Sequence, residues 1–74
     1  MPVLRIDLHG IKHEDVRRTL IANIESHWND SPPPDFVVVT GHSEQMRGIV
    51  KEVGNEYDLN IEEGLHPSYM RLTF

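Results

Sequence analysis

The chain begins with a stretch that alternates like a β-strand and then turns: Leu4-Arg5-Ile6-Asp7-Leu8-His9-Gly10. Side chains along a strand point to opposite faces with a period of two, so the three hydrophobic residues share one face and must meet a core. Asp7 and His9 share the other face, roughly 6–7 Å apart along the strand. Gly10 follows where the backbone must turn tightly or let another group approach. The pattern predicts a carboxylate beside an imidazole at the end of a strand, and a merely solvated polar face is the alternative.

Length and composition limit the class of protein. The 74 residues suffice for a single domain, residues 1–74, with one modest core. No cysteine is present, which excludes disulfides and thiolate zinc sites. No apolar stretch approaches the roughly 20 residues that a membrane span needs, so we expect a cytoplasmic protein with no membrane partner.

The net charge of −5 argues against a protein that holds nucleic acid by its overall positive potential. The acidic excess is concentrated in residues 52–74, where five acidic residues against one basic residue give −4. A local phosphate site in the remainder of the chain is therefore compatible with the composition.

The rest of the chain alternates helical and strand patterns. Hydrophobic residues that recur every four positions predict a helix over residues 13–28, and the three prolines that follow would end it. Residues 36–40 are apolar on both faces, as is typical of a central parallel strand. Ser43 is placed to cap a second helix, and two short strands follow over residues 59–62 and 69–74, with a loop over 63–68. The order βαβαββ predicts an α/β two-layer sandwich, a four-stranded mixed sheet with two helices on one face.

We expect a core with a helical side and a sheet side. The helical side is predicted to contain Val16, Leu20, Ile24, Met46, Ile49, Val50 and Val53, and the sheet side Ile6, Leu8, Val37, Val39, Leu72 and Phe74. Trp28 continues the repeat of the first helix. Gly48 and Gly54 weaken the second helix, which suggests that they allow close packing against the sheet.

Both predicted strand-to-helix turns carry polar residues, and parallel strands place them at the same edge of the sheet. The second turn, Thr40-Gly41-His42-Ser43, opens onto a helix N-terminus, where backbone N–H groups favour a phosphate. Arg47 and Lys51 follow on one helical face and would extend a phosphate track. Asp7 and His9 would then lie beside a phosphodiester, which suits its hydrolysis.

These motifs resemble those of the Smr (small MutS-related) domain family. Ile6-Asp7-Leu8-His9-Gly10 resembles the family's Leu-Asp-x-His-Gly signature. Thr40-Gly41-His42-Ser43 resembles its second signature, Thr-Gly-x-Gly-x-His-Ser, with the middle removed, and His66-Pro67-Ser68 echoes an Asn-Pro-Gly found near the end of the domain. The resemblance extends from about Leu4 to Phe74. The second glycine of the turn and its usual basic residue are missing.

The resemblance implies nucleic-acid binding and endonuclease or nicking activity on DNA or RNA. By motif match, Asp7 and His9 are the implied catalytic pair, and Thr40, Gly41, His42 and Ser43 form the implied phosphate-contacting turn. Together with the pattern of the chain, this predicts a site with catalytic residues Asp7, His9 and His42 and nucleic-acid-binding residues Gly10, Lys12, Thr40, Gly41, Ser43, Arg47 and Lys51. It also implies a protein partner in a repair or RNA-processing assembly. The alternative is a non-catalytic module that binds nucleic acid or protein. The sequence contains neither an HExxH motif nor a His-x-His pair, so it does not predict a dedicated metal site. A weakly held Mg²⁺ or Mn²⁺ would instead be brought in by the phosphate.

Overall fold

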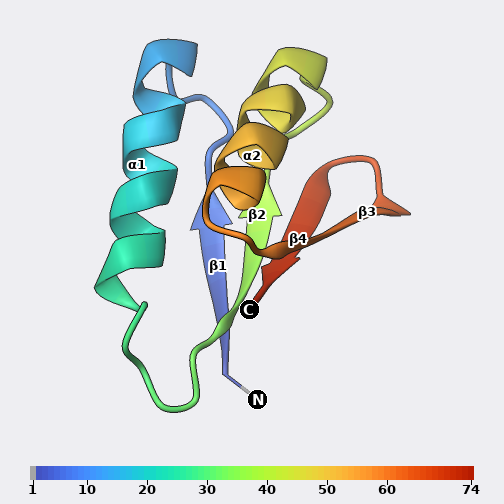
Figure 1. Ribbon diagram of the computed structural model, residues 1–74. Helices are drawn as coiled ribbons and strands as arrows, with labels where there is room; N and C mark the ends of the chain where they lie inside the picture. The colour runs from blue at the N-terminus through green and yellow to red at the C-terminus, as the bar shows by residue number, and fades with distance from the viewer. Residues whose placement is uncertain (1) are drawn as a thin grey trace.

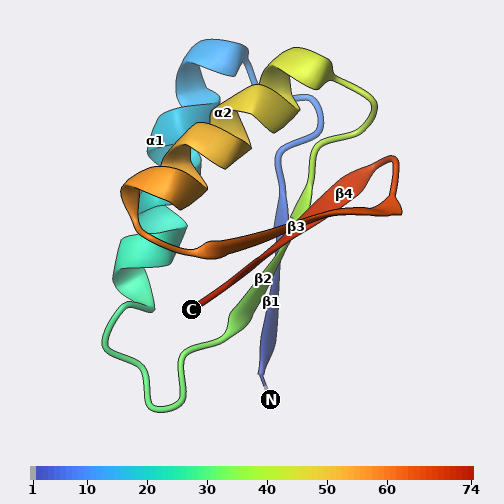
Figure 2. The ribbon, with the colours of Figure 1, turned by 45° about the vertical axis from the view of Figure 1, so that its right-hand side comes forward.

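The chain folds into two helices packed on one face of a four-stranded mixed sheet, as its patterns predict (Figures 1 and 2). The computed structural model describes residues 2–74, except for the side chain of Leu65. The predicted domain also includes Met1, which lies outside the described residues. The elements are β1 (Val3–Asp7), α1 (His13–Ser26), β2 (Asp35–Val39), α2 (Glu44–Glu56), β3 (Asn60–His66) and β4 (Tyr69–Thr73).

The strand order is β1-β2-β4-β3, so the two central strands are β2 and β4. β1 pairs with β2 in parallel, and β4 pairs with β2 and with β3 in antiparallel fashion. In Figure 2 both helices lie on the same side of the sheet and leave its other face uncovered. No helix in the described part of the chain is long and apolar enough to cross a membrane.

One hydrophobic cluster fills the space between the helices and the sheet. It contains Ile6, Leu8, Val16, Leu20, Ile24, Phe36, Val38, Met46, Val50, Val53, Leu59, Met70 and Leu72. Most of the predicted core is therefore confirmed, and Ile49 packs against the cluster while remaining partly exposed.

The prediction for the core face of β2 is wrong. Phe36 and Val38 are fully buried, whereas Val37 and Val39 are half-buried and face the uncovered side of the sheet. Apolar residues on both faces of this strand hide its alternation, so the pattern alone does not choose the inner face. Phe74 is also placed outside the core, since it is 40% exposed at the end of the sheet.

Two predicted boundaries also differ from the structure. α1 ends at Ser26, because the N–H groups of His27 and Trp28 turn back to the carbonyls of Ile24 and Glu25. Trp28 therefore leaves the helical repeat and is 45% exposed. β3 extends through most of the predicted loop, with an irregular register between Glu62 and His66 that accommodates the extra residues.

The two glycines of α2 lie in different surroundings. A Cβ on Gly54 would lie 3.0 Å from two carbons of Ile61 and 3.2 Å from Leu72, so this glycine allows the helix to approach the sheet. A Cβ on Gly48 would meet nothing within 4 Å. The close-packing prediction is thus confirmed for Gly54 and wrong for Gly48.

Alanine at these two positions should change stability in opposite directions. Gly48→Ala gains up to about 1 kcal/mol of helix propensity without a clash. Gly54→Ala makes the same gain but must overpack Ile61 and Leu72, which typically costs about 1–3 kcal/mol. Urea unfolding followed by circular dichroism should show a higher midpoint for Gly48→Ala and a lower one for Gly54→Ala. Equal shifts would contradict the packing described for Gly54.

Candidate functional site

The carboxyl ends of β1 and β2 meet at one edge of the sheet. Asp7 is opposite Val39 in the parallel ladder, and the N–H of Leu8 continues it by donating to the Val39 carbonyl at 2.9 Å. The β1–α1 turn (residues 8–12) and the β2–α2 turn (residues 40–43) therefore lie side by side, at the upper end of the molecule in Figure 1. This is the edge at which open α/β sheets bind ligands.

The β1–α1 turn is a tight turn that Asp7 helps to close. The N–H of Ile11 donates to the Leu8 carbonyl at 3.1 Å, and Gly10 has a φ of 87°, which a side chain would strain. The Asp7 carboxylate accepts the N–H of His9 at 3.0 Å, as short acidic side chains do at turns. Asp7 thus has a structural role. One of its oxygens makes this bond, and a carboxylate has capacity for further contacts.

His9 reaches across to the neighbouring turn. A Cβ built on Gly41 would lie 3.0 Å from Cδ2 of the His9 ring, so the imidazole packs on the bare glycine backbone. Gly41 also has a φ of 62°, in the left-handed region. This contact brings the two sequence motifs onto one surface, on which His42 is also exposed.

The backbone of the β2–α2 turn is less available to a ligand than its sequence suggests. The N–H groups of Thr40 and Gly41 both donate to the carbonyl of Ser68, at 2.9 and 3.0 Å. The Thr40 hydroxyl is buried and donates to the Gly41 carbonyl at 3.0 Å. These two N–H groups are therefore already occupied, and only the N–H groups farther along the turn and at the start of α2 are left for a phosphate.

The β3–β4 turn supplies the Ser68 carbonyl that accepts the N–H groups of Thr40 and Gly41. His66 Nδ1 accepts the N–H of Ser68 at 3.1 Å and lies 2.6 Å from its hydroxyl, which fixes this turn. The His66 ring stacks on Tyr69, with centroids 5.2 Å apart. The motif His66-Pro67-Ser68 thus acts on the β2–α2 turn from a distant part of the chain.

Ser43 caps α2, as predicted. Its hydroxyl accepts the N–H of Met46 at 3.2 Å and lies 3.5 Å from Nε2 of His13, in the first turn of α1. His13 is exposed, and the start of α1 places it beside the β2–α2 turn, which the spacing of the motifs does not reveal.

The basic pair of α2 is directed to the β3–β4 hairpin. Arg47 donates to the Pro67 carbonyl at 2.9 Å and lies 3.6 Å from the Glu63 carboxylate, and Lys51 lies 3.1 Å from the same carboxylate. The prediction that both share one helical face is confirmed. Their role as a free phosphate track is not supported, because Glu63 offsets part of their charge.

Lys12 is the remaining cation at this edge. It occupies the N-cap position of α1 without making a side-chain cap bond, and it forms no ion pair within residues 2–74. An open hollow lies around it, lined by Ile11, Lys12, His13 and Glu14. We define the candidate site as Asp7, His9, Lys12, His13, His42 and Ser43.

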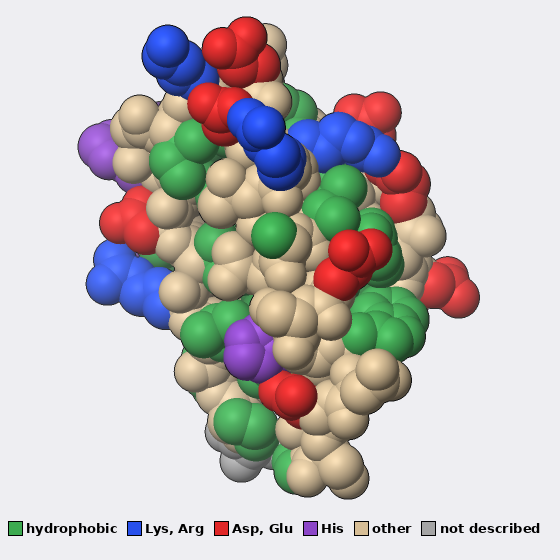
Figure 3. All heavy atoms as spheres, turned by 90° about the vertical axis from the view of Figure 1, so that its left-hand side faces the viewer, with side chains coloured by type: hydrophobic (Ala, Val, Ile, Leu, Met, Phe, Trp, Pro, Cys, Tyr) green, Lys and Arg blue, Asp and Glu red, His purple; other side chains and the backbone are tan. Residues whose placement is uncertain are grey.

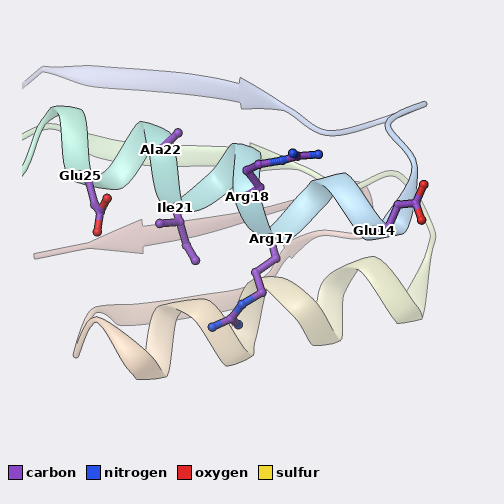
Figure 4. A pocket seen from close by; sticks show the side chains of 6 residues that line it. All are labelled: Glu14, Arg17, Arg18, Ile21, Ala22 and Glu25. Carbon is purple, nitrogen blue, oxygen red and sulfur yellow. The ribbon is translucent and has the colours of Figure 1, made fainter.

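A second hollow lies along α1, away from this edge. Figure 4 shows the residues that line it: Glu14, Arg17, Arg18, Ile21, Ala22 and Glu25. Its two arginines are already paired, since Arg17 forms an ion pair with Glu56 of α2 and Arg18 with Asp15. The Arg17 guanidinium lowers the pKa of the Glu56 carboxyl through their hydrogen bond. We therefore read this region as a solvated helix face that fastens α1 to α2.

The donor set does not fit a resident metal ion. Within the described residues, no three His, Asp or Glu side chains are arranged to hold one. Mg²⁺ or Mn²⁺ carried by a phosphate remains an expectation from the sequence.

Comparison with protein families, with curated proteins and with solved structures finds no match to this chain. The resemblance to the Smr family therefore rests on the two signatures and the His66-Pro67-Ser68 motif quoted above. In the structure the two signatures meet through His9 and Gly41, and the carbonyl of Ser68 accepts N–H groups of the second signature.

The contact between His9 and Gly41 can be tested by a double-variant cycle. Gly41→Ala should lower the free energy of unfolding by more than Gly10→Ala, because both place alanine at positive φ but only Gly41→Ala also collides with His9. Adding His9→Ala should relieve part of the Gly41→Ala loss, with a coupling energy of about 0.5–3 kcal/mol in urea unfolding. Strict additivity of the two changes would refute the contact.

Proposed function

We propose that this domain binds nucleic acid at the candidate site and belongs to the Smr type. The observation that carries the proposal is the contact of His9 with Gly41, since it joins groups from two separate motifs on one surface. Lys12, with no ion-pair partner in residues 2–74, supplies a cation for a phosphate there. The proposal includes a cytoplasmic location, for which the absence of cysteine is compatible with a reducing compartment.

We further propose that the site hydrolyses a phosphodiester. One imidazole, His9, would take a proton from water as its oxygen attacks phosphorus, and a second, His42, would protonate the leaving oxygen. Asp7 accepts the backbone N–H of His9. Its negative charge would stabilise the imidazolium that forms as His9 takes the proton. The support is the presence of an acid and two exposed histidines at the same edge.

A second candidate function is binding without cleavage. It is favoured by the bonds of Thr40 and Gly41 to Ser68, because fewer backbone N–H groups remain to stabilise the charge that develops on a phosphate. The net charge of −5 repels nucleic acid, which favours weak binding or binding that a partner protein assists. A partner in a repair or RNA-processing assembly would supply that assistance.

Removal of the charge of Lys12 should weaken binding. Lys12→Gln should lower the affinity for labelled DNA and RNA oligonucleotides and reduce the slope of log K against log salt by about one unit, as one lost phosphate contact predicts. Lys51→Gln is the matched control, because Glu63 already pairs with that amine. Equal slopes for wild type and Lys12→Gln in anisotropy titrations would mean that the site lies elsewhere.

Asp7→Asn should separate catalysis from folding. Asparagine keeps a carbonyl oxygen that can accept the His9 N–H, so the turn and the melting temperature should be retained while cleavage is lost. The assay is nicking of supercoiled plasmid and cleavage of structured RNA, with Mg²⁺, with Mn²⁺ and with chelator, and Asp15→Asn serves as a control outside the site. Full cleavage by Asp7→Asn would remove Asp7 from the catalytic groups, and inactive wild-type protein that still binds would establish the non-catalytic alternative.

A further inference from the structure

A group of aromatic side chains lies at the end of the molecule opposite the candidate site. Trp28 follows α1, and its ring centroid lies 5.7 Å from that of Tyr57 and 5.3 Å from that of Phe74, both in edge-to-face arrangement. Phe74 in turn lies 5.8 Å from Phe36, which is fully buried at the start of β2. We call Trp28, Tyr57 and Phe74 the aromatic surface.

The aromatic surface is anchored to the core but remains open to solvent. Trp28 is 45% exposed and Phe74 40% exposed, although each ring is held by its neighbours. Aromatic rings held in this way offer contact area at a low cost in conformational entropy, and tryptophan and tyrosine are enriched among the residues that dominate binding energy. The surface is therefore suited to a binding partner.

The charge around the rings selects the kind of partner. The segments that carry them, residues 25–36, 55–60 and 72–74, contain five acidic residues and no lysine or arginine: Glu25, Asp30, Asp35, Glu56 and Asp58. Two of these pair with arginines, Asp35 with Arg71 and Glu56 with Arg17. On the face shown in Figure 3, the Lys and Arg side chains lie in the upper and middle parts, and the lower part carries hydrophobic, acidic and histidine side chains.

The three other carboxylates are not paired with a lysine or arginine in residues 2–74. Glu25 accepts the Tyr57 hydroxyl at 2.8 Å, and Asp30 lies 2.7 Å from Nδ1 of His27. The bond to Glu25, together with burial, raises the pKa of Tyr57. Asp58 is exposed next to Tyr57. Three of the five carboxylates in these segments therefore carry negative charge that no lysine or arginine within residues 2–74 pairs with.

We propose that the aromatic surface binds a basic peptide segment of a partner protein, with arginine side chains lying on the exposed rings and paired with the surrounding carboxylates. A guanidinium stacks on aromatic faces and bonds carboxylates in the same plane, so one side chain can use both features. Nucleic acid and anionic lipid would be repelled by the same carboxylates. A second copy of the chain would bring a second set of them into contact.

The test uses Trp28, the single tryptophan of the chain, as a reporter. A short peptide of alternating arginine and glycine should change its fluorescence in a saturable manner, with an affinity that falls as salt rises. The same peptide with citrulline in place of arginine is the matched control, since the urea group of citrulline keeps the planar shape but has no charge and replaces N–H donors with a carbonyl oxygen. It should bind at least about tenfold more weakly, which corresponds to 1.4 kcal/mol or more.

The position of the binding site can be tested by titrating the labelled peptide with protein variants and measuring the fluorescence anisotropy of the peptide. Trp28→Ala should weaken binding about tenfold or more, and Trp28→Phe should restore part of it because a ring is kept. Asp58 has a φ of 59°, a conformation that asparagine tolerates, so Asp58→Asn should keep the fold and still weaken binding about threefold or more. Asp15→Asn, at the other end of α1, should have no effect.

Binding that is equal for the citrulline peptide, or unchanged in both Trp28→Ala and Asp58→Asn, would overturn the proposal. A single-stranded oligonucleotide that displaces the peptide would assign the surface to nucleic acid instead. Dimerisation in sedimentation velocity that Trp28→Ala abolishes would assign it to a second copy. None of these results depends on cleavage or on Lys12, so failure here is distinguishable from failure of the proposed nucleic-acid site.

Discussion

The parallel pairing of β1 with β2 determines where every group of the candidate site lies. Its last backbone bond, from the Leu8 N–H to the Val39 carbonyl, holds the two strand ends in register and leads directly into the two turns. A shift of one residue in β1 would turn Leu8, which is fully buried, to the uncovered face and carry Asp7 into the core. The hydrophobic alternation of β1 and the position of Asp7 therefore depend on the same register, and so does the approach of His9 to Gly41.

The elements with a clear period could be predicted from the sequence, and those without one could not. β1 alternates strictly and both helices repeat their hydrophobic residues, so their inner faces follow from the pattern. β2 is apolar on both faces, and its inner residues, Phe36 and Val38, emerge only from packing. Trp28 keeps the helical spacing although α1 has already ended. The spacing of hydrophobic residues does not reveal the backbone bonds that end α1 at His27.

The residues of the candidate site could be identified from the sequence, but their partners could not. Ser43 as a cap and the adjacency of the two turns follow from local rules. The contacts that limit the site come from the β3–β4 hairpin, where the carbonyl of Ser68 occupies two N–H groups of the β2–α2 turn and Glu63 pairs with the basic residues of α2. Both residues were expected in a loop, and the hydrophobic pattern does not show which part of the fold a loop contacts. The same long-range packing separates the two ends of the molecule, with histidines and Lys12 at one and exposed rings among carboxylates at the other.

The central claim is that the two motifs form one binding surface for nucleic acid. The most direct measurement is an NMR titration of ¹⁵N-labelled protein with a short oligonucleotide, in the presence of chelator. The account predicts that the largest amide shifts fall together on residues 8–13 and 41–43, with a common dissociation constant, while the amides of Trp28 and Phe74 change little. Shifts centred on Trp28 and Phe74, or confined to only one of the two turns, would contradict it.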